Sequence, residues 1–75
     1  MARAPTRESI LGELAKRVRA ARARVELTQE EASSRAGIDY KRWQRIEAGT
    51  ANPSMVTLAR IAAALETSVW KMLGK

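Results

Sequence analysis

Apolar residues in the first third of the chain recur in alternating steps of three and four. They stand at Leu11, Leu14, Val18, Ala21 and Val25. This spacing places them on one face of an α-helix and predicts an amphipathic helix over about residues 9–24. Ala is used heavily and Phe is absent, which also favours helices over strands. No alternating strand pattern occurs in the sequence.

Start and stop signals divide the rest of the chain into shorter helices. The residues suited to an N-cap are Thr28 (with Glu31 in a capping-box pattern), Asp39, Ser54 and Ser68. Gly37 and Gly49 can end helices in the left-handed conformation. The helices expected between these signals span about residues 29–36, 40–48 and 55–65, with a last short one after Ser68. The sequence therefore predicts an all-α domain of five short helices.

A chain of 75 residues has room for one domain with a thin core. Pro5 discourages an early helix start, so residues 1–8 are expected to form a flexible basic arm before a domain over 9–75. Cys and His are absent, which excludes disulfides, zinc sites built on thiolate or imidazole, and His-dependent nucleophiles. We therefore expect no enzyme activity, no metal and no cofactor.

The formal net charge of +6 indicates a polyanionic partner, either nucleic acid or an anionic membrane surface. No apolar run approaches the roughly 20 residues of a membrane span, and no signal segment follows the first residues. The first helix needs its apolar stripe for the core, which disfavours binding to a membrane surface. A cytoplasmic protein is expected.

Two charged residues are predicted to face inward. At 100° per residue, Arg22 lies about 40° from the centre of the first helix's apolar stripe, and Glu47 lies about 40° from Trp43. A thin core does not normally hold an unpaired charge. We expect Arg22 and Glu47 to pair across the two helices; the alternative is that both extend past the edge of the core into water.

The opposite face of the predicted helix over 40–48 carries long donors and no carboxylate. Lys41 and Arg45 stand opposite Trp43, and Gln44 and Arg42 flank them. Arg and Lys can donate to guanine edges and phosphates, and Gln can pair with adenine. An ordinary solvated face is the alternative, although such faces usually mix charge signs.

The end of the chain offers more apolar surface than so small a core can absorb. Val69, Trp70, Met72 and Leu73 fall within one short helical segment. We expect Val69 or Trp70, with Leu73, to meet a second copy of the chain. The alternative is that all of them cap the core of the monomer.

An ordered set of motifs from Leu14 to Leu73 resembles the Cro/repressor-type, or XRE-like, helix-turn-helix family. The motifs are Val18-Arg19, Arg22, Leu27-Thr28-Gln29-Glu30-Glu31, Gly37-Ile38-Asp39, Ile46-Glu47 with Gly49, Asn52-Pro53-Ser54, and Ala64-Leu65 with Ser68-Val69. The ordered set is far more specific than a single match. The resemblance implies a phage-repressor-like DNA-binding domain whose helix-turn-helix spans 29–36 and 40–48.

The resemblance also implies roles for individual residues. The family's phosphate-clamping Gln falls on Gln29, and its buried Arg–Glu pair falls on Arg22 and Glu47. Its base-reading positions fall on Tyr40, Lys41 and Arg45. Residues that would reach the backbone or nearby bases are Arg42 and Gln44, with Thr28, Thr50 and Asn52 as further candidate contacts.

Several positions depart from the family pattern. Ala21, Ala32 and Ser33 are smaller than usual, and Trp43 is larger and could fill the volume they leave. The usual Gly after the first and fourth helices is Glu26 and Glu66. Because a left-handed Glu costs roughly 1 kcal/mol, these two turns are expected to have another shape.

The function expected from these observations is sequence-specific binding to double-stranded DNA. A homodimer on a pseudo-palindromic operator would act as a phage-type repressor or a restriction–modification controller. The alternative is an antitoxin or another protein-interaction module that uses the same fold to bind a partner protein. Hydrolytic activity is disfavoured, since paired inward carboxylates are also missing.

Overall fold

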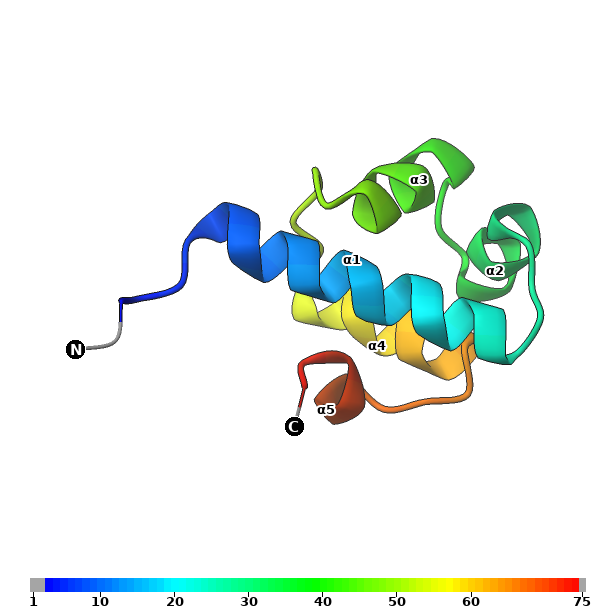
Figure 1. Cartoon of the computed structure of the whole chain (residues 1–75). Helices are drawn as coiled ribbons and strands as arrows, with labels where there is room; N and C mark the ends of the chain where they lie inside the picture. The colour runs from blue at the N-terminus through cyan, green and yellow to red at the C-terminus, as the bar shows by residue number, and fades with distance from the viewer. Residues whose placement is uncertain (1–2, 75) are drawn as a thin grey trace.

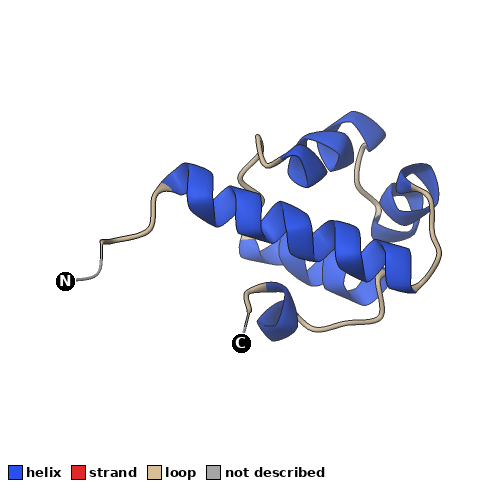
Figure 2. Ribbon diagram, in the orientation of Figure 1, coloured by secondary structure: helices blue, strands red, loops and turns tan. Residues whose placement is uncertain are grey.

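The computed structural model describes residues 3–74, and within them it contains five α-helices and no strand (Figure 2). The helices are α1 (Arg7–Arg24), α2 (Gln29–Ala36), α3 (Tyr40–Ala48), α4 (Met55–Ala64) and α5 (Val69–Met72). The expected all-α class with five helices is confirmed, and α2 and α3 have the expected bounds. The first two residues of the predicted arm, and Lys75 of the predicted domain, lie outside the described residues.

The first helix begins two residues earlier than the sequence predicted, so the arm expected over 1–8 is too long. Thr6 caps α1: its hydroxyl accepts from the Ser9 backbone N–H at 3.1 Å. The Ser9 hydroxyl in turn accepts from the Thr6 N–H at 3.0 Å. A capping box usually carries Glu or Gln in the place of Ser9, and the shorter side chain hid this start signal in the sequence.

The other helix ends follow the expected signals. The capping side chains of Thr28, Asp39, Ser54 and Ser68 each accept a backbone N–H in the first turn that follows. Gly37 and Gly49 end α2 and α3 with φ of 68° and 78°. The four capping side chains satisfy some of the backbone N–H groups that have no partner at the start of a helix.

The turns after α1 and α4 differ from the prediction. Glu26 and Glu66 both adopt φ of 57°, the left-handed conformation that the family's Gly would take. Both turns therefore keep the glycine-type shape despite a Cβ atom. In each, a backbone N–H reaches back over the preceding turn: Leu27 N–H donates to the Arg22 carbonyl and Thr67 N–H to the Ala62 carbonyl.

The helices enclose one apolar core. Helix α3 packs against α1, α2 against both α3 and α4, and α5 against α4 and α1, so that α3 and α5 lie on opposite sides of α1 (Figure 1). The largest fully buried side chains are Trp43, Ile46, Ile61, Leu65 and Val18. Trp43 belongs to the same buried cluster as Ala21 and Ala32.

Candidate nucleic-acid interface

The outward side of α3 is a polar, basic surface, which we call the α3 face. Its exposed residues are Tyr40, Lys41, Arg42, Gln44 and Arg45. Within residues 3–74, no ion pair engages Lys41, Arg42 or Arg45. The three cations are therefore available to an external anion. The helical angles used in the sequence analysis predicted that Lys41, Arg42 and Arg45 face outward, and all three are exposed.

The start of α3 is fixed by its own cap. One carboxylate oxygen of Asp39 accepts from the backbone N–H groups of Lys41 at 3.1 Å and Arg42 at 3.3 Å. These N–H groups belong to the first turn of the helix, where donors have no intrahelical partner. The backbone that carries the first residues of the α3 face is thereby held at the helix entrance.

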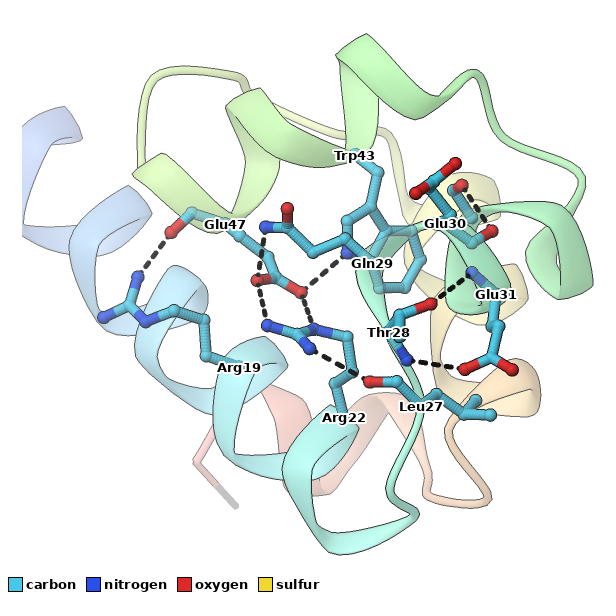
Figure 3. A network of polar contacts seen from close by, with 10 residues as sticks. Arg19, Arg22, Leu27, Thr28, Gln29, Glu30, Glu31, Trp43 and Glu47 are labelled. Atoms are coloured by element: carbon cyan, nitrogen blue, oxygen red, sulfur yellow. Dashed lines mark hydrogen bonds and ion pairs between the residues drawn. The ribbon is translucent and has the colours of Figure 1, made fainter.

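The underside of α3 carries a buried ion pair, shown in Figure 3. Arg22 Nε lies 2.6 Å from Glu47 Oε2, and Arg22 Nη2 lies 2.9 Å from Glu47 Oε1. The Glu47 side chain is only 2% exposed, and that of Arg22 is 22% exposed. This bidentate geometry joins α1 to α3 at the position that the helix angles predicted, rather than at the edge of the core.

Two further donors reach the same carboxylate. Gln29 Nε2 donates to Glu47 Oε1 at 2.9 Å, and Trp43 Nε1 donates to Glu47 Oε2 at 2.6 Å. Burial alone would raise the pKa of Glu47, but the hydrogen bonds from Arg22, Gln29 and Trp43 and the charge of Arg22 outweigh it. The pKa of Glu47 is therefore lowered, and the group is charged at neutral pH.

The Trp43 contact is absent from the sequence prediction, although the sequence holds a signal for it. A buried indole N–H needs an acceptor, and Glu47 stands four residues later on the same helix. The spacing of one turn brings the two side chains together.

A second arginine of α1 also contacts α3. Arg19 Nη1 donates to the backbone carbonyl of Glu47, one of the carbonyls that the end of α3 leaves without an intrahelical partner. Arg22 Nη1 donates to the carbonyl of Leu27 at 3.0 Å. Sequence reasoning missed both contacts, because a pattern of side chains does not show which backbone carbonyls remain free.

The remaining predicted contact residues lie around α3. Thr28 is exposed, and its hydroxyl accepts from the Glu31 N–H at 3.0 Å. Thr50 is exposed just after α3 and donates to the Arg45 carbonyl through its N–H at 3.0 Å and its hydroxyl at 3.2 Å. Asn52 is exposed too, but it borders a groove formed with α1, α4 and α5.

The predicted dimer residues lie on the other side of α1. Trp70 is 66% exposed and Leu73 is 42% exposed, whereas Val69 is half-buried against the core. We call these three residues the α5 surface. Met72 is buried, so the alternative, in which all of these residues cap the core of the monomer, holds for Met72 and not for Trp70.

Comparison with known proteins agrees with this geometry. A family profile described as helix-turn-helix domain matches residues 13–69. The restriction-modification controller protein C.AhdI from Aeromonas hydrophila is similar, with 27% identity and a TM-score of 0.80 over 83% of this chain and 94% of that one. A hypothetical transcription factor, NHTF from Neisseria, has 25% identity and a TM-score of 0.83 over 97% of this chain and 84% of the other.

A third similar structure supports the fold alone. An HTH_3 family transcriptional regulator from Vibrio cholerae has 23% identity and a TM-score of 0.85, covering 92% of this chain and 39% of that one. A search of curated sequences gives no significant match.

The profile covers most of the chain, so the protein belongs to the helix-turn-helix domain family. The family expected from the sequence is confirmed, and with it the class of DNA-binding regulators. Helices α2 and α3 are the two helices of the motif. Among the described residues, no helix has the length and apolar character needed to cross a bilayer.

Proposed function

We propose that the chain binds double-stranded DNA in a sequence-specific manner, with α3 in the major groove. The observation that carries this proposal is the α3 face: a basic helix surface without paired acids, held from below by a buried carboxylate. An α-helix fits the major groove, and Arg, Lys and Gln are the side chains that most often contact bases there.

The place of each side chain suggests its role. Lys41 and Arg45 lie in the middle of the α3 face and are assigned to base edges, with Gln44 beside them. Arg42 lies at the border, where the phosphate backbone would pass, and is assigned to positioning. Tyr40 is suited to stacking on a sugar or contacting a thymine methyl group.

Three more residues complete the proposed contact surface. Gln29 stands at the first position of α2, and helix N-termini favour phosphate groups. Thr28 and Thr50 carry exposed hydroxyl groups on either side of α3. Asn52 is the weakest member of the proposed set, since it borders a groove that faces other helices.

The proposed active species is a homodimer on a pseudo-palindromic operator, because one module covers only one half-site. The α5 surface supports this assembly. Leu73 also borders an apolar groove of about 530 Å³ together with Ile10 and Met55, both of which are more than half exposed. A second copy that covers this region would remove its apolar side chains from water.

The particular role that we propose is a restriction–modification controller or a phage-type repressor. Similarity over nearly the whole length of the controller protein C.AhdI favours the controller role. A protein-interaction module without DNA binding would not need the acid-free α3 face.

An operator is first selected from random DNA. The experiment then measures the affinity of Arg45→Ala and of Arg42→Ala for this operator, for its single-base variants and for random duplex, across a salt series. Arg45→Ala should lose about 1–3 kcal/mol on the operator and lose preference at one base pair. Arg42→Ala should weaken all duplexes alike and lower the salt slope by about one unit. Equal loss by Arg45→Ala on every duplex contradicts its assignment to base reading. No preference of the parent protein at physiological salt contradicts sequence-specific binding.

A further inference from the structure

The Glu47 carboxylate receives four hydrogen bonds, two on each oxygen. Oε1 accepts from Arg22 Nη2 and Gln29 Nε2, both at 2.9 Å. Oε2 accepts from Arg22 Nε and Trp43 Nε1, both at 2.6 Å. The carboxylate thereby connects three elements: the end of α1 through Arg22, the first residue of α2 through Gln29, and α3 itself through Trp43 (Figure 3).

The Gln29 side chain has one orientation in this arrangement. An ionised carboxylate only accepts hydrogen bonds, so the amide nitrogen of Gln29 must face Glu47. That nitrogen carries two hydrogens, of which Glu47 engages one. Within residues 3–74 no other hydrogen bond uses the Gln29 side chain, and the residue is half-buried. The second N–H is thus oriented and without a protein acceptor.

Charge would normally prevent an anion from approaching an amide that already faces a carboxylate. Here Arg22 neutralises Glu47 through two hydrogen bonds. A phosphate oxygen on the other side of the amide therefore meets a dipole beside a neutral pair rather than a bare negative charge. Gln29 also stands at the N-terminus of α2, which favours a phosphate group.

Trp43 fixes this arrangement to α3. Arg22 is partly exposed, and its further hydrogen bond goes to the Leu27 carbonyl before α2, so the ion pair alone does not fix the carboxylate against the body of α3. The indole of Trp43 is fully buried, which leaves its N–H little freedom, and this N–H holds Oε2 in place. Without it, the Glu47 carboxylate and the Gln29 amide that depends on it would have more accessible orientations, and ordering them on DNA would cost more.

Resting on the proposed DNA-binding function, we propose that Trp43 is a positioning residue for a phosphate contact: its indole N–H holds Glu47, and Glu47 presents the second side-chain N–H of Gln29 to a backbone phosphate. Trp43 itself is buried and touches no DNA. One carboxylate thus holds both Gln29 of α2, which contacts the phosphate, and α3, which contacts the bases. The Gln29–Glu47 hydrogen bond persists in the complex.

The test removes one hydrogen-bond donor and keeps the shape. Chemical synthesis of the chain allows Trp43→β-(3-benzothienyl)alanine, in which sulfur replaces the indole N–H, while Trp70 stays unchanged. Affinity is measured at low salt for a mixed-sequence duplex of about 30 base pairs, which is long enough for two half-sites. The isostere and Gln29→Ala should each weaken binding about 3- to 10-fold, the effect of one net hydrogen bond.

The decisive measurement is the affinity of a chain that carries both the isostere and Gln29→Ala. The isostere should cause little further loss in Gln29→Ala, because the contact that it positions is already gone. In the matched control Arg42→Ala, a phosphate contact of α3 that does not touch Glu47, the losses should multiply. The salt slope of the isostere should equal that of the parent, because no cation is removed. Losses that multiply in Gln29→Ala, or an isostere within twofold of the parent, overturn the proposal.

A measurement on the parent protein does not depend on how any variant folds. Nuclear magnetic resonance should show the Trp43 indole proton and one Gln29 amide proton protected from exchange, both before and after the duplex is added. Loss of the Gln29 protection on DNA means that the side chain leaves Glu47 to bind, which overturns the proposal while DNA binding stands. A parent that binds no duplex at low salt overturns the proposed function, and this inference with it.

Discussion

The α3 face and the α5 surface lie on opposite sides of α1 and are built in opposite ways. The α3 face carries cations that form no ion pair within residues 3–74, above a buried carboxylate that has four donors. The α5 surface carries apolar side chains on α5, a helix of four residues, and on Leu73 directly after it. Trp70 there is 66% exposed, whereas Trp43 beneath α3 is fully buried.

The difference shows how one small core supports two kinds of surface. A surface that reads DNA must hold its side chains in register, and here polar contacts from α1 and α2 fix α3 from below. The α5 surface, which we propose meets a second copy, would need shape and area rather than a fixed polar network. Stability should therefore depend strongly on residues beneath α3 and weakly on the α5 surface.

The largest expected effect is on Glu47. Glu47→Ala leaves Arg22 partly buried without its partner and also removes the acceptor of Trp43, so the free energy of unfolding should fall by about 3–5 kcal/mol. At concentrations low enough for the chain to be monomeric, Trp70→Ala should change it by less than about 0.5 kcal/mol, because its side chain is mostly exposed. Denaturant unfolding of both variants measures the contrast.

Glu13→Ala is the matched control for the carboxylate. Glu13 lies 3.7 Å from both Lys16 and Arg17, and all three side chains are well exposed. Exposed pairs of this kind contribute between zero and about 1 kcal/mol. If Glu47→Ala costs no more than Glu13→Ala, the site beneath α3 is wet, and the contrast between the two regions is lost.

Acid should act on the α3 side of the molecule in a graded way. The pKa of Glu47 is lowered from its ordinary value of 4.5, so the unfolded chain takes up the proton first. The stabilisation from Glu47 is complete above about pH 4.5 and is lost as the pH falls through the pKa that Glu47 has in the folded state. Unfolding midpoints measured from neutral to acidic pH should therefore decrease below that value.

The exposed Glu31 needs its own control. The backbone and side-chain hydrogen bonds with Thr28 also lower the pKa of Glu31. Glu31→Gln should leave most of the acid dependence, and Glu47→Gln should remove most of it. The reverse result would place the acid-sensitive group at the start of α2 instead of beneath α3.

Dimerisation should depend on the α5 surface and not on the α3 face, the reverse of what we expect for stability. Trp70→Ala should weaken dimerisation by about 1–3 kcal/mol, as truncation of a central aromatic residue usually does, while Tyr40→Ala on the α3 face should leave it unchanged. Sedimentation equilibrium gives both values. A parent protein that is monomeric at high micromolar concentration, free and on DNA, contradicts the role of the α5 surface.

Much of this architecture could be predicted because its signals are local. Capping residues and Gly gave the bounds of α2 and α3, and helix angles placed Arg22 and Glu47 inward. The start of α1 was misplaced because Ser9 acts in a capping box that usually contains a longer side chain. Its reciprocal hydrogen bonds with Thr6 become apparent only in the structure.

Contacts that depend on tertiary packing were harder to predict. The Arg19 contact to the Glu47 carbonyl requires knowing where the end of α3 meets α1. Gln29 was expected to contact phosphate, but its hydrogen bond to Glu47 joins residues from different helices. A periodic pattern defines the face of each helix and does not define the position of one helix along another.

The smallest expected effect tests the turns that lead into the two regions. Glu26 precedes α2 and Glu66 precedes α5, and both have φ of 57°. Gly would remove a strain of about 1 kcal/mol, and its greater freedom in the unfolded chain would offset part of this gain. We expect Glu26→Gly and Glu66→Gly each to raise the free energy of unfolding by about 0.5 kcal/mol. Glu66 also loses an exposed pair with Arg35 at 3.9 Å, which should matter little. Paired denaturation curves decide the point: a loss of stability in Glu26→Gly alone would show that the side chain of Glu26 supports the region beneath α3 in a way that Glu66 does not support α5.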